Sequence, residues 1–210
     1  MKTLYASDLS LKEVHRLFGF QRRYNNSFIP LLSLKPTTES EQQELIQIAK
    51  DFDYYLIEGK VAEGQVKILT VAPLLRLAGF YRYPIQMTLE ESIAEINIED
   101  EDTKITGRID LLAVNKAQRI GKNALFWVLI VETKNNKAAP SAGLPQLLAY
   151  AHESLKIQPA VWGLITNGEL YQFVYIEGGN TPTYQLMPFL NLMETESGIK
   201  ILQVLKAISK

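Results

Sequence analysis

Apolar residues repeat at helical spacing in several parts of the chain. The clearest segment covers residues 60–79, where apolar side chains recur every three or four positions and Gly79 follows as a stop signal. Pro73 lies inside this segment and is expected to kink the helix or divide it into two pieces. The same spacing predicts further helices at residues 8–18, 40–51, 144–157 and 187–207.

The second half of the chain also carries strand patterns. Residues 124–131 form a nearly continuous apolar run, which is typical of a central buried strand. Residues 105–114 alternate and then become apolar, and the polar segment 115–123 predicts a hairpin turn between the two strands. Further strands are expected at residues 80–87, 93–98, 160–166 and 170–176, the last two joined by a tight turn at Asn167-Gly168. This order of elements predicts an α/β domain with a mixed sheet.

The composition is that of an ordinary globular protein, with 47% hydrophobic and 21% charged residues among 210. One domain is the default expectation for this length. The formal net charge is -1, so global charge gives no support for nucleic-acid binding. Any contact with DNA must therefore involve a local basic patch or metal ions. No segment approaches the ~18 apolar residues that span a bilayer, and no signal peptide is visible, so we expect a cytoplasmic protein.

The residue types also limit the chemistry. There are no cysteines and only two histidines, His15 and His152. Disulfides, thiolate zinc sites, cysteine nucleophiles and multi-histidine metal sites are therefore excluded. A metal ion here must be held mainly by oxygen ligands, which favours Mg²⁺, Mn²⁺ or Ca²⁺.

Three charged residues lie in or at the end of the two strongest strand segments. Asp110 is a carboxylate inside an apolar run, and an unpaired buried carboxylate costs several kcal/mol unless it has a partner or a metal. Glu132 and Lys134 are two residues apart where the buried strand ends, so they point to the same face. The hairpin places Asp110 roughly opposite residues 128–130, and a bulge or small register change would move it closer to Glu132.

Two carboxylates at this range can share a divalent cation that activates water and offsets the charge of a scissile phosphate. Lys134 could position or deprotonate the attacking water, or stabilise the pentavalent phosphate. Taken alone, Glu132 and Lys134 could also be a surface ion pair worth ~0–1 kcal/mol and without chemical interest.

Asp110, followed after a hairpin by Glu132-x-Lys134, resembles the signature of the PD-(D/E)XK nucleases, with Ile109 in place of the proline. The resemblance runs from about Glu63 to Phe173 and is closest to the N-terminal nuclease domain of type I restriction subunits. It also rests on the acidic residue Glu63 at a helix start, the Gln146-x-x-x-Tyr150 helix and the turn Thr166-Asn167-Gly168.

The resemblance implies a restriction-endonuclease-like core (αβββαβ), in which a mixed central sheet is flanked by helices. It implies residues 58–210 as this core and residues 1–57 as an N-terminal helical extension packed on it. The implied metal ligands are Asp110, Glu132 and Glu63, with Glu58 as a substitute for Glu63; the implied catalytic residues are Asp110, Glu132, Lys134 and Gln146.

The implied activity is Mg²⁺-dependent endonucleolytic hydrolysis of DNA, with Mn²⁺ as a substitute metal. DNA is the implied partner, together with a second copy of the chain or the subunits of a restriction complex. The near-neutral charge and the acidic segment 90–102 leave an alternative open. In that alternative the chain is a catalytically inactive module that keeps the fold and binds nucleic acid or a protein partner. Metal affinity would separate the two, since an inactive module need not bind Mg²⁺.

Overall fold

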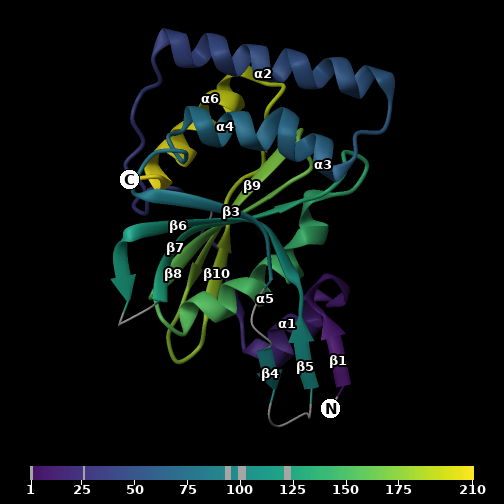
Figure 1. Ribbon diagram of the computed structural model, residues 1–210, viewed down its shortest axis with the longest axis vertical. Helices are drawn as coiled ribbons and strands as arrows, with labels where there is room; N and C mark the ends of the chain where they lie inside the picture. Colours follow the sequence, from purple (N-terminus) through teal and green to yellow (C-terminus); the bar gives the residue numbers. More distant parts are fainter. Residues whose placement is uncertain (1, 26, 93–95, 99–102, 121–123) are drawn as a thin grey trace.

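A twisted mixed sheet forms the middle layer of the protein (Figure 1). The computed structural model describes residues 2–25, 27–92, 96–98, 103–120 and 124–210. The strands of this sheet are β2 (Gln21–Arg23), β3 (Ile85–Ser92), β6 (Arg108–Ile120), β7 (Ala124–Thr133), β8 (Ala160–Thr166), β9 (Leu170–Glu177), β10 (Thr183–Leu186) and β11 (Leu190–Asn191). Their order is β2-β10-β9-β8-β7-β6-β3, and β11 pairs with β9. The pairs β7–β8 and β2–β10 are parallel and the other pairs are antiparallel.

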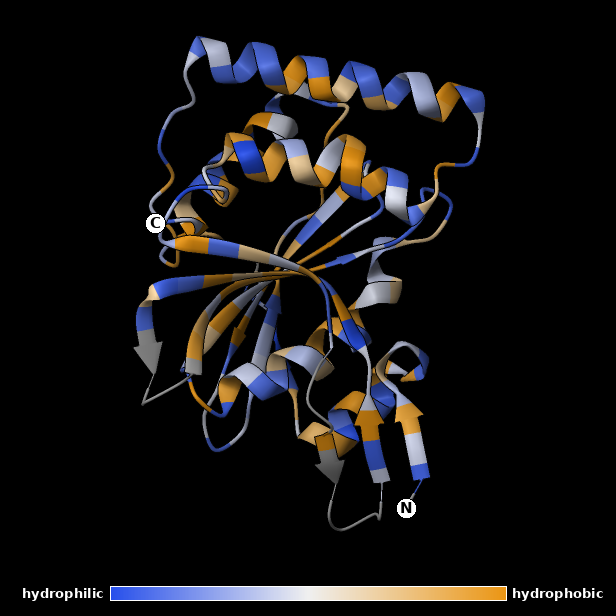
Figure 2. Ribbon diagram, viewed as in Figure 1, coloured by the Kyte–Doolittle hydropathy of each residue, from blue (hydrophilic) through white to orange (hydrophobic). Residues whose placement is uncertain are grey.

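Helices cover both faces of the sheet, as the sequence predicts for a mixed α/β domain (Figure 1). On one face lie α2 (Glu39–Glu58), α3 (Glu63–Val66), α4 (Ala72–Leu77) and α6 (Thr195–Ile208); on the other lie α1 (Leu11–Phe18) and α5 (Leu144–Leu155). Strand β7 contributes to both cores, since Leu129 and Val131 pack on the first side and Ile130 on the second. This explains its nearly continuous apolar sequence. Figure 2 shows the same contrast, with hydrophobic central strands and a largely hydrophilic outer helix α2.

A second, small sheet lies beside the main one and contains β1 (Lys2–Tyr5), β4 (Ile96–Ile98) and β5 (Thr103–Thr106) in the order β1-β5-β4. Strand β1 runs parallel to β5 and continues into the 3₁₀ turn η1 (Ala6–Asp8). The prediction that residues 1–57 are helical is therefore wrong for β1 and β2. Both strands are very short and mostly exposed, so they leave no alternating apolar pattern in the sequence. A domain boundary near residue 57 stays a prediction.

The helical segment predicted at residues 60–79 is confirmed, and it is divided as Pro73 requires. A π-helical turn, η2 (Lys67–Val71), connects α3 to α4. Its last hydrogen bond runs from the Ala72 N–H to the Lys67 carbonyl. Proline lacks the N–H that would continue the regular ladder, and the wider turn accommodates this loss. Lys67 is the first residue of this π turn.

Several sequence-based boundaries are wrong. The strand expected at residues 80–87 begins only at Ile85, after a turn. Strand β6 continues to Ile120 through much of the expected turn 115–123, of which residues 121–123 lie outside the described residues. The strand expected at 93–98 is described only as β4, because residues 93–95 also lie outside the described part. Strand β10 was not predicted.

The helix expected at residues 187–207 begins only at Thr195. Leu190 instead pairs with Tyr171 as part of β11, and Met187 is buried in the main core. The apolar residues of this segment are thus buried from an extended chain. Strand β8, the turn at Asn167-Gly168 and helix α5 agree closely with the sequence-based prediction. Within the described part of the chain, none of the helices combines the length and apolar character that crossing a membrane requires.

The turn between β8 and β9 provides a test of the packing of α2 on the sheet. Gly168 has φ +93, and a Cβ atom there would overlap the buried ring of Phe52. We expect Gly168→Ala to lower the free energy of unfolding by about 2–4 kcal/mol, from overpacking and left-handed backbone strain. Gly64→Ala is the matched control, because a Cβ there meets open space within a helix. It is expected to raise stability by about 0.5–1 kcal/mol. Urea denaturation measures both, and equal effects of the two changes would contradict this packing.

Candidate active site

The candidate site lies where β6 and β7 stop pairing. Their register ends with Leu111 opposite Val131, so the next residues outward, Asp110 and Glu132, face each other at the end of the ladder. Two register shifts, between Ala113 and Val114 and between Asn115 and Arg119, produce this alignment. Asp110 does lie next to Glu132, but not from the expected starting register. The hairpin closes with Ile120 opposite Ala124, which without shifts would set Asp110 opposite Lys134 instead of residues 128–130, and the two shifts bring it back to Glu132.

Asp110 is held by three hydrogen-bond donors. Its Oδ2 accepts from the backbone N–H of Thr133 at 2.8 Å and from the Thr133 hydroxyl at 2.7 Å. Its Oδ1 accepts from Lys67 Nζ at 2.9 Å. The carboxylate thus bonds to a β7 amide beyond the last β6–β7 backbone pair. Charge-assisted bonds of this kind are stronger than neutral ones, so the Asp110 side chain is fixed in place.

Glu132 has the opposite environment. Its side chain is completely buried, and neither carboxylate oxygen has a hydrogen-bond partner among the described residues. Burial raises the pKa of Glu132 well above its usual value, and the negative charge of Asp110 raises it further. Lys134, the nearby backbone N–H of Asp110 and Lys67 act in the other direction but do not outweigh burial. Glu132 is therefore a buried acid whose nearby positive charges do not offset its burial.

Lys134 begins a chain of hydrogen bonds that crosses to helix α5. Lys134 Nζ donates to Gln146 Oε1 at 3.3 Å, and Gln146 Nε2 donates to the Tyr150 hydroxyl at 2.9 Å. Tyr150 in turn donates to the backbone carbonyl of Arg108 at 2.8 Å. Burial and the nearby Glu132 charge raise the pKa of Tyr150, so its hydroxyl remains a donor. A Cβ at Gly107 would lie 2.7 Å from that hydroxyl, which explains the glycine before Arg108.

Lys67 and Glu90 belong to the site but were not predicted from the sequence. Lys67 Nζ bridges Asp110 Oδ1 at 2.9 Å and Glu90 Oε1 at 2.8 Å. Burial lowers the pKa of Lys67, but the bonds to Glu90 and Asp110 outweigh it and raise the pKa overall. Glu90 has φ +52, a strained backbone conformation for this residue type. The available signal was that Lys67 lies one helical turn after Glu63, on the same face.

Of the residues predicted to act together, the structure places Asp110 opposite Glu132 and joins Lys134 to Gln146. Glu63 begins α3, one turn before Lys67, and is partly buried. The described residues contain no group of three or more Asp, Glu, His or Cys side chains that could hold a metal ion, so Glu63 does not join the two carboxylates.

The donor set nevertheless fits a divalent cation. Glu132 offers two buried oxygens without hydrogen-bond partners in the described chain, and Asp110 lies opposite. Mg²⁺ is commonly bound through only one or two carboxylates, with water and substrate phosphate completing its shell. The roles of Glu63, Asp110 and Glu132 as ligands stay predictions.

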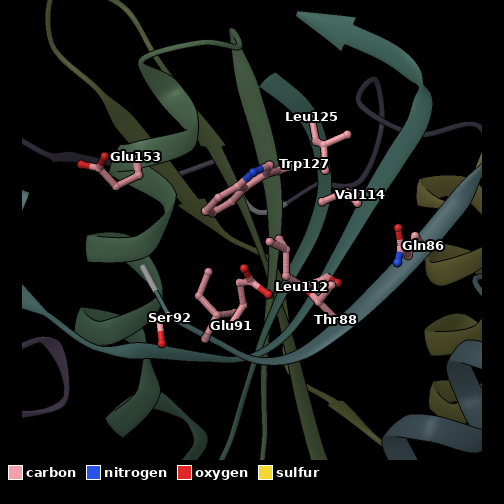
Figure 3. Close-up of a pocket in the computed structure, with 10 residues that line it drawn as sticks. Gln86, Thr88, Glu91, Ser92, Leu112, Val114, Leu125, Trp127 and Glu153 are labelled. Carbon is pink, nitrogen blue, oxygen red and sulfur yellow. Dashed lines mark hydrogen bonds between the residues drawn. The ribbon is translucent and has the colours of Figure 1, made fainter. Parts of the chain in front are cut away.

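A separate hollow of about 310 Å³ lies on the sheet beside α5 (Figure 3). Trp127, Leu112 and Val114 line it together with side chains of β3, and Glu153 of α5 lies at its margin. Asp110, Glu132, Lys134 and Gln146 do not line it. This largely apolar hollow is therefore distinct from the polar cluster at the end of the ladder.

Comparison with known proteins leaves the family open. No family model matches the chain, and no curated protein matches it. One solved structure with partial similarity is a fragment described as an HsdR subunit of a type I restriction enzyme from Vibrio vulnificus YJ016. The two are 20% identical with a TM-score of 0.41, and the match covers 69% of this chain. The matched region spans about a quarter (26%) of that structure. This likeness is too low to carry a functional argument.

The absence of partners for Glu132 predicts a pH-dependent cost to stability. Because its pKa is higher in the folded than in the unfolded chain, the cost is absent below the unfolded pKa of about 4.3 and grows as the pH rises above it. In metal-free buffer we expect Glu132→Gln to raise the free energy of unfolding by roughly 1–3 kcal/mol at pH 8 and by much less near pH 4.5. Urea denaturation at both pH values measures this difference.

The control is Glu196→Gln, at an exposed position on α6, with an expected change below about 0.5 kcal/mol. A Glu132→Gln variant that is destabilised at pH 8 would mean that the native carboxylate has a stabilising partner.

The bonds of Tyr150 give a second stability test. Tyr150→Phe removes the hydroxyl and leaves the Arg108 carbonyl and the Gln146 amide without this partner. We expect a loss of about 1–3 kcal/mol in unfolding free energy, measured by urea denaturation. Tyr24→Phe is the same change at a tyrosine that is 81% exposed, and should have almost no effect. Equal stability of the two variants would show that the hydroxyl of Tyr150 contributes nothing.

Proposed function

We propose that the protein is a Mg²⁺-dependent endonuclease of the restriction type, which hydrolyses phosphodiester bonds in DNA. The observation that carries this proposal is the buried Glu132 carboxylate without a recorded partner, opposite Asp110 and followed by Lys134. A fold retains an uncompensated buried acid at a cost, and such groups concentrate at functional sites. A divalent cation would compensate this charge.

The chain's own residues have distinct roles in this proposal. Asp110 and Glu132 would hold Mg²⁺, with Mn²⁺ as a substitute. When bound, the metal lowers the pKa of water and offsets charge on the scissile phosphate. Lys134 orients the attacking water or stabilises the phosphate in the transition state. Gln146 holds the Lys134 ammonium in place through its 3.3 Å bond, and Tyr150 fixes Gln146.

The order of elements supports the same proposal. Helices α3–α4, strands β3, β6 and β7, helix α5 and strand β8 follow one another in the order αβββαβ, with β4 and β5 between β3 and β6. We propose that these elements correspond to the restriction-endonuclease-like core. Glu63 at the start of α3 would then be a further candidate ligand, although in the described chain it does not group with the two carboxylates.

The second candidate is an inactive module that binds nucleic acid or a protein partner, such as a second copy of the chain or the subunits of a restriction complex. The ion pair between Lys67 and Asp110 favours it, because an ammonium group already neutralises one carboxylate that the metal would need. The net charge of -1 is also compatible with a protein partner.

Metal binding and cleavage together test the nuclease proposal. Isothermal titration with Mg²⁺ and Mn²⁺ is expected to show binding to the wild type and little or none to Asp110→Asn or Glu132→Gln. With plasmid and single-stranded DNA as substrates, Lys134→Met is expected to lower the cleavage rate roughly 100-fold or more while metal binding persists.

Lys50→Met is the matched control, since Lys50 is exposed on α2, across the sheet from α5. It should cleave like the wild type. Metal titrations are repeated with DNA present, so that a shell completed by phosphate is also detected. A wild type that neither binds metal under these conditions nor cleaves DNA would refute the nuclease and favour the inactive module.

A further inference from the structure

A cavity of about 330 Å³, lined mainly by residues with polar side chains, opens next to the candidate site, and part of its wall comes from the N-terminal segment. Gln146 and Tyr150, which connect Lys134 to Arg108, also line this cavity. The remaining lining residues are Tyr5, Ser7, Ser92, Thr106, Gly107 and Arg108. The parallel pairing of β1 with β5 sets Tyr5 beside Thr106 and so closes one side.

The lining has the chemistry of an anion site. It presents a guanidinium, an amide and five hydroxyl groups, of which those of Tyr5, Ser92 and Thr106 remain to donate, since Tyr150 donates to the Arg108 carbonyl and Ser7 to Asp8. Among the residues that the structure describes, no carboxylate lines the cavity. Within the same ranges, the exposed Arg108 side chain has no recorded ion-pair partner. A guanidinium without a partner beside hydroxyl donors suits a phosphate group, which it can bind through two parallel hydrogen bonds.

The position of the cavity indicates which phosphate it would take. Its wall is one hydrogen bond away from Lys134, through the 3.3 Å contact with Gln146. A phosphate held here would therefore neighbour the one presented to Glu132 and Lys134. Tyr5 is 58% exposed at the edge of the cavity, where its ring could stack against a base of the same strand.

We propose that this cavity binds a backbone phosphate of a nucleic-acid strand, next to the phosphate that is cleaved. The proposal rests on the nuclease function proposed above and adds a substrate contact outside the carboxylate cluster. Arg108 supplies the charge, Thr106 supplies a hydroxyl group, and Tyr5 supplies a stacking surface. In this proposal the N-terminal strand takes part in substrate binding as well as in packing.

The test is nucleic-acid affinity without metal, so that it does not depend on cleavage. Fluorescence anisotropy follows the binding of short labelled single-stranded and duplex DNA to the full chain in EDTA, over a series of salt concentrations. We expect Arg108→Gln to weaken binding about tenfold or more and to reduce the slope of log K against log salt by roughly 0.7–0.9, the contribution of one phosphate contact. Thr106→Val is expected to weaken binding severalfold.

Lys50→Gln removes the same charge from the other face and should change neither affinity nor slope. The backbone carbonyl of Arg108 keeps its bond to Tyr150 in Arg108→Gln, so this variant should retain the thermal midpoint of the wild type. Equal affinities of Arg108→Gln and Lys50→Gln would overturn the assignment, as would a wild type without DNA affinity. If deoxyadenosine monophosphate bound as tightly as the oligonucleotide, the cavity would be a site for a free nucleotide and not for a nucleic-acid strand. That result would also overturn the assignment.

Cleavage of plasmid DNA with Mg²⁺, measured in parallel, separates the two proposals. If the wild type cleaves DNA but Arg108→Gln binds DNA as tightly as Lys50→Gln, the nuclease proposal is supported and the phosphate site is refuted. If DNA binding depends on Arg108 but the wild type does not cleave DNA, the phosphate site is supported and the nuclease proposal is refuted.

Discussion

The carboxylate of Asp110 completes a strand ladder that the backbone leaves unfinished. Beyond Leu111 and Val131, β6 and β7 no longer pair, and the amide of Thr133 bonds to a side chain instead of a neighbouring strand. Because a side chain takes the place of the neighbouring strand here, β6 and β7 separate at this end, while β7 stays paired with β8 up to Thr133. The other polar groups of the site lie around this end of the ladder, on strands and on helix α5. Sites built on strands and helices hold their geometry more closely than sites built on loops.

Two carboxylates of similar intrinsic acidity occupy opposite environments at this end of the ladder. Asp110 has an amide, a hydroxyl and an ammonium group as donors, whereas Glu132 is buried without a recorded partner. The surrounding backbone also departs from regular geometry, in the π turn that begins at Lys67 and in the left-handed conformation of Glu90. Strain and uncompensated charge in one place reduce stability, and such features persist where function selects for them. This arrangement gives a physical reason to look for chemistry at the end of this ladder.

The central elements of the site could be predicted from the sequence because their placement depends on local rules. Strand alternation sets Glu132 and Lys134 on one face, and the hairpin brings Asp110 back toward them. Lys67 could not be predicted because it lies 43 residues before Asp110, on a helix whose orientation relative to β6 the sequence does not reveal. The sequence places Tyr150 on the same helix as Gln146, but the bond from its buried hydroxyl to Arg108 depends on a tertiary contact with β6. Strands β1 and β2 are too short and too exposed to leave a periodic signal.

The pairing of the N-terminal strands has a consequence for the order of folding. Lys2 pairs with Thr103, and Gln21 pairs with Thr183. Domains fold as the chain emerges from the ribosome, N-terminus first, and contacts between distant residues form slowly because a long loop must close. Neither strand has its partner until that distant segment has been synthesised. Strands β1 and β2 are thus made well before their partners and reach their final place only after those partners exist. Tyr5 can meet Thr106 only after the whole segment between the two residues has been synthesised.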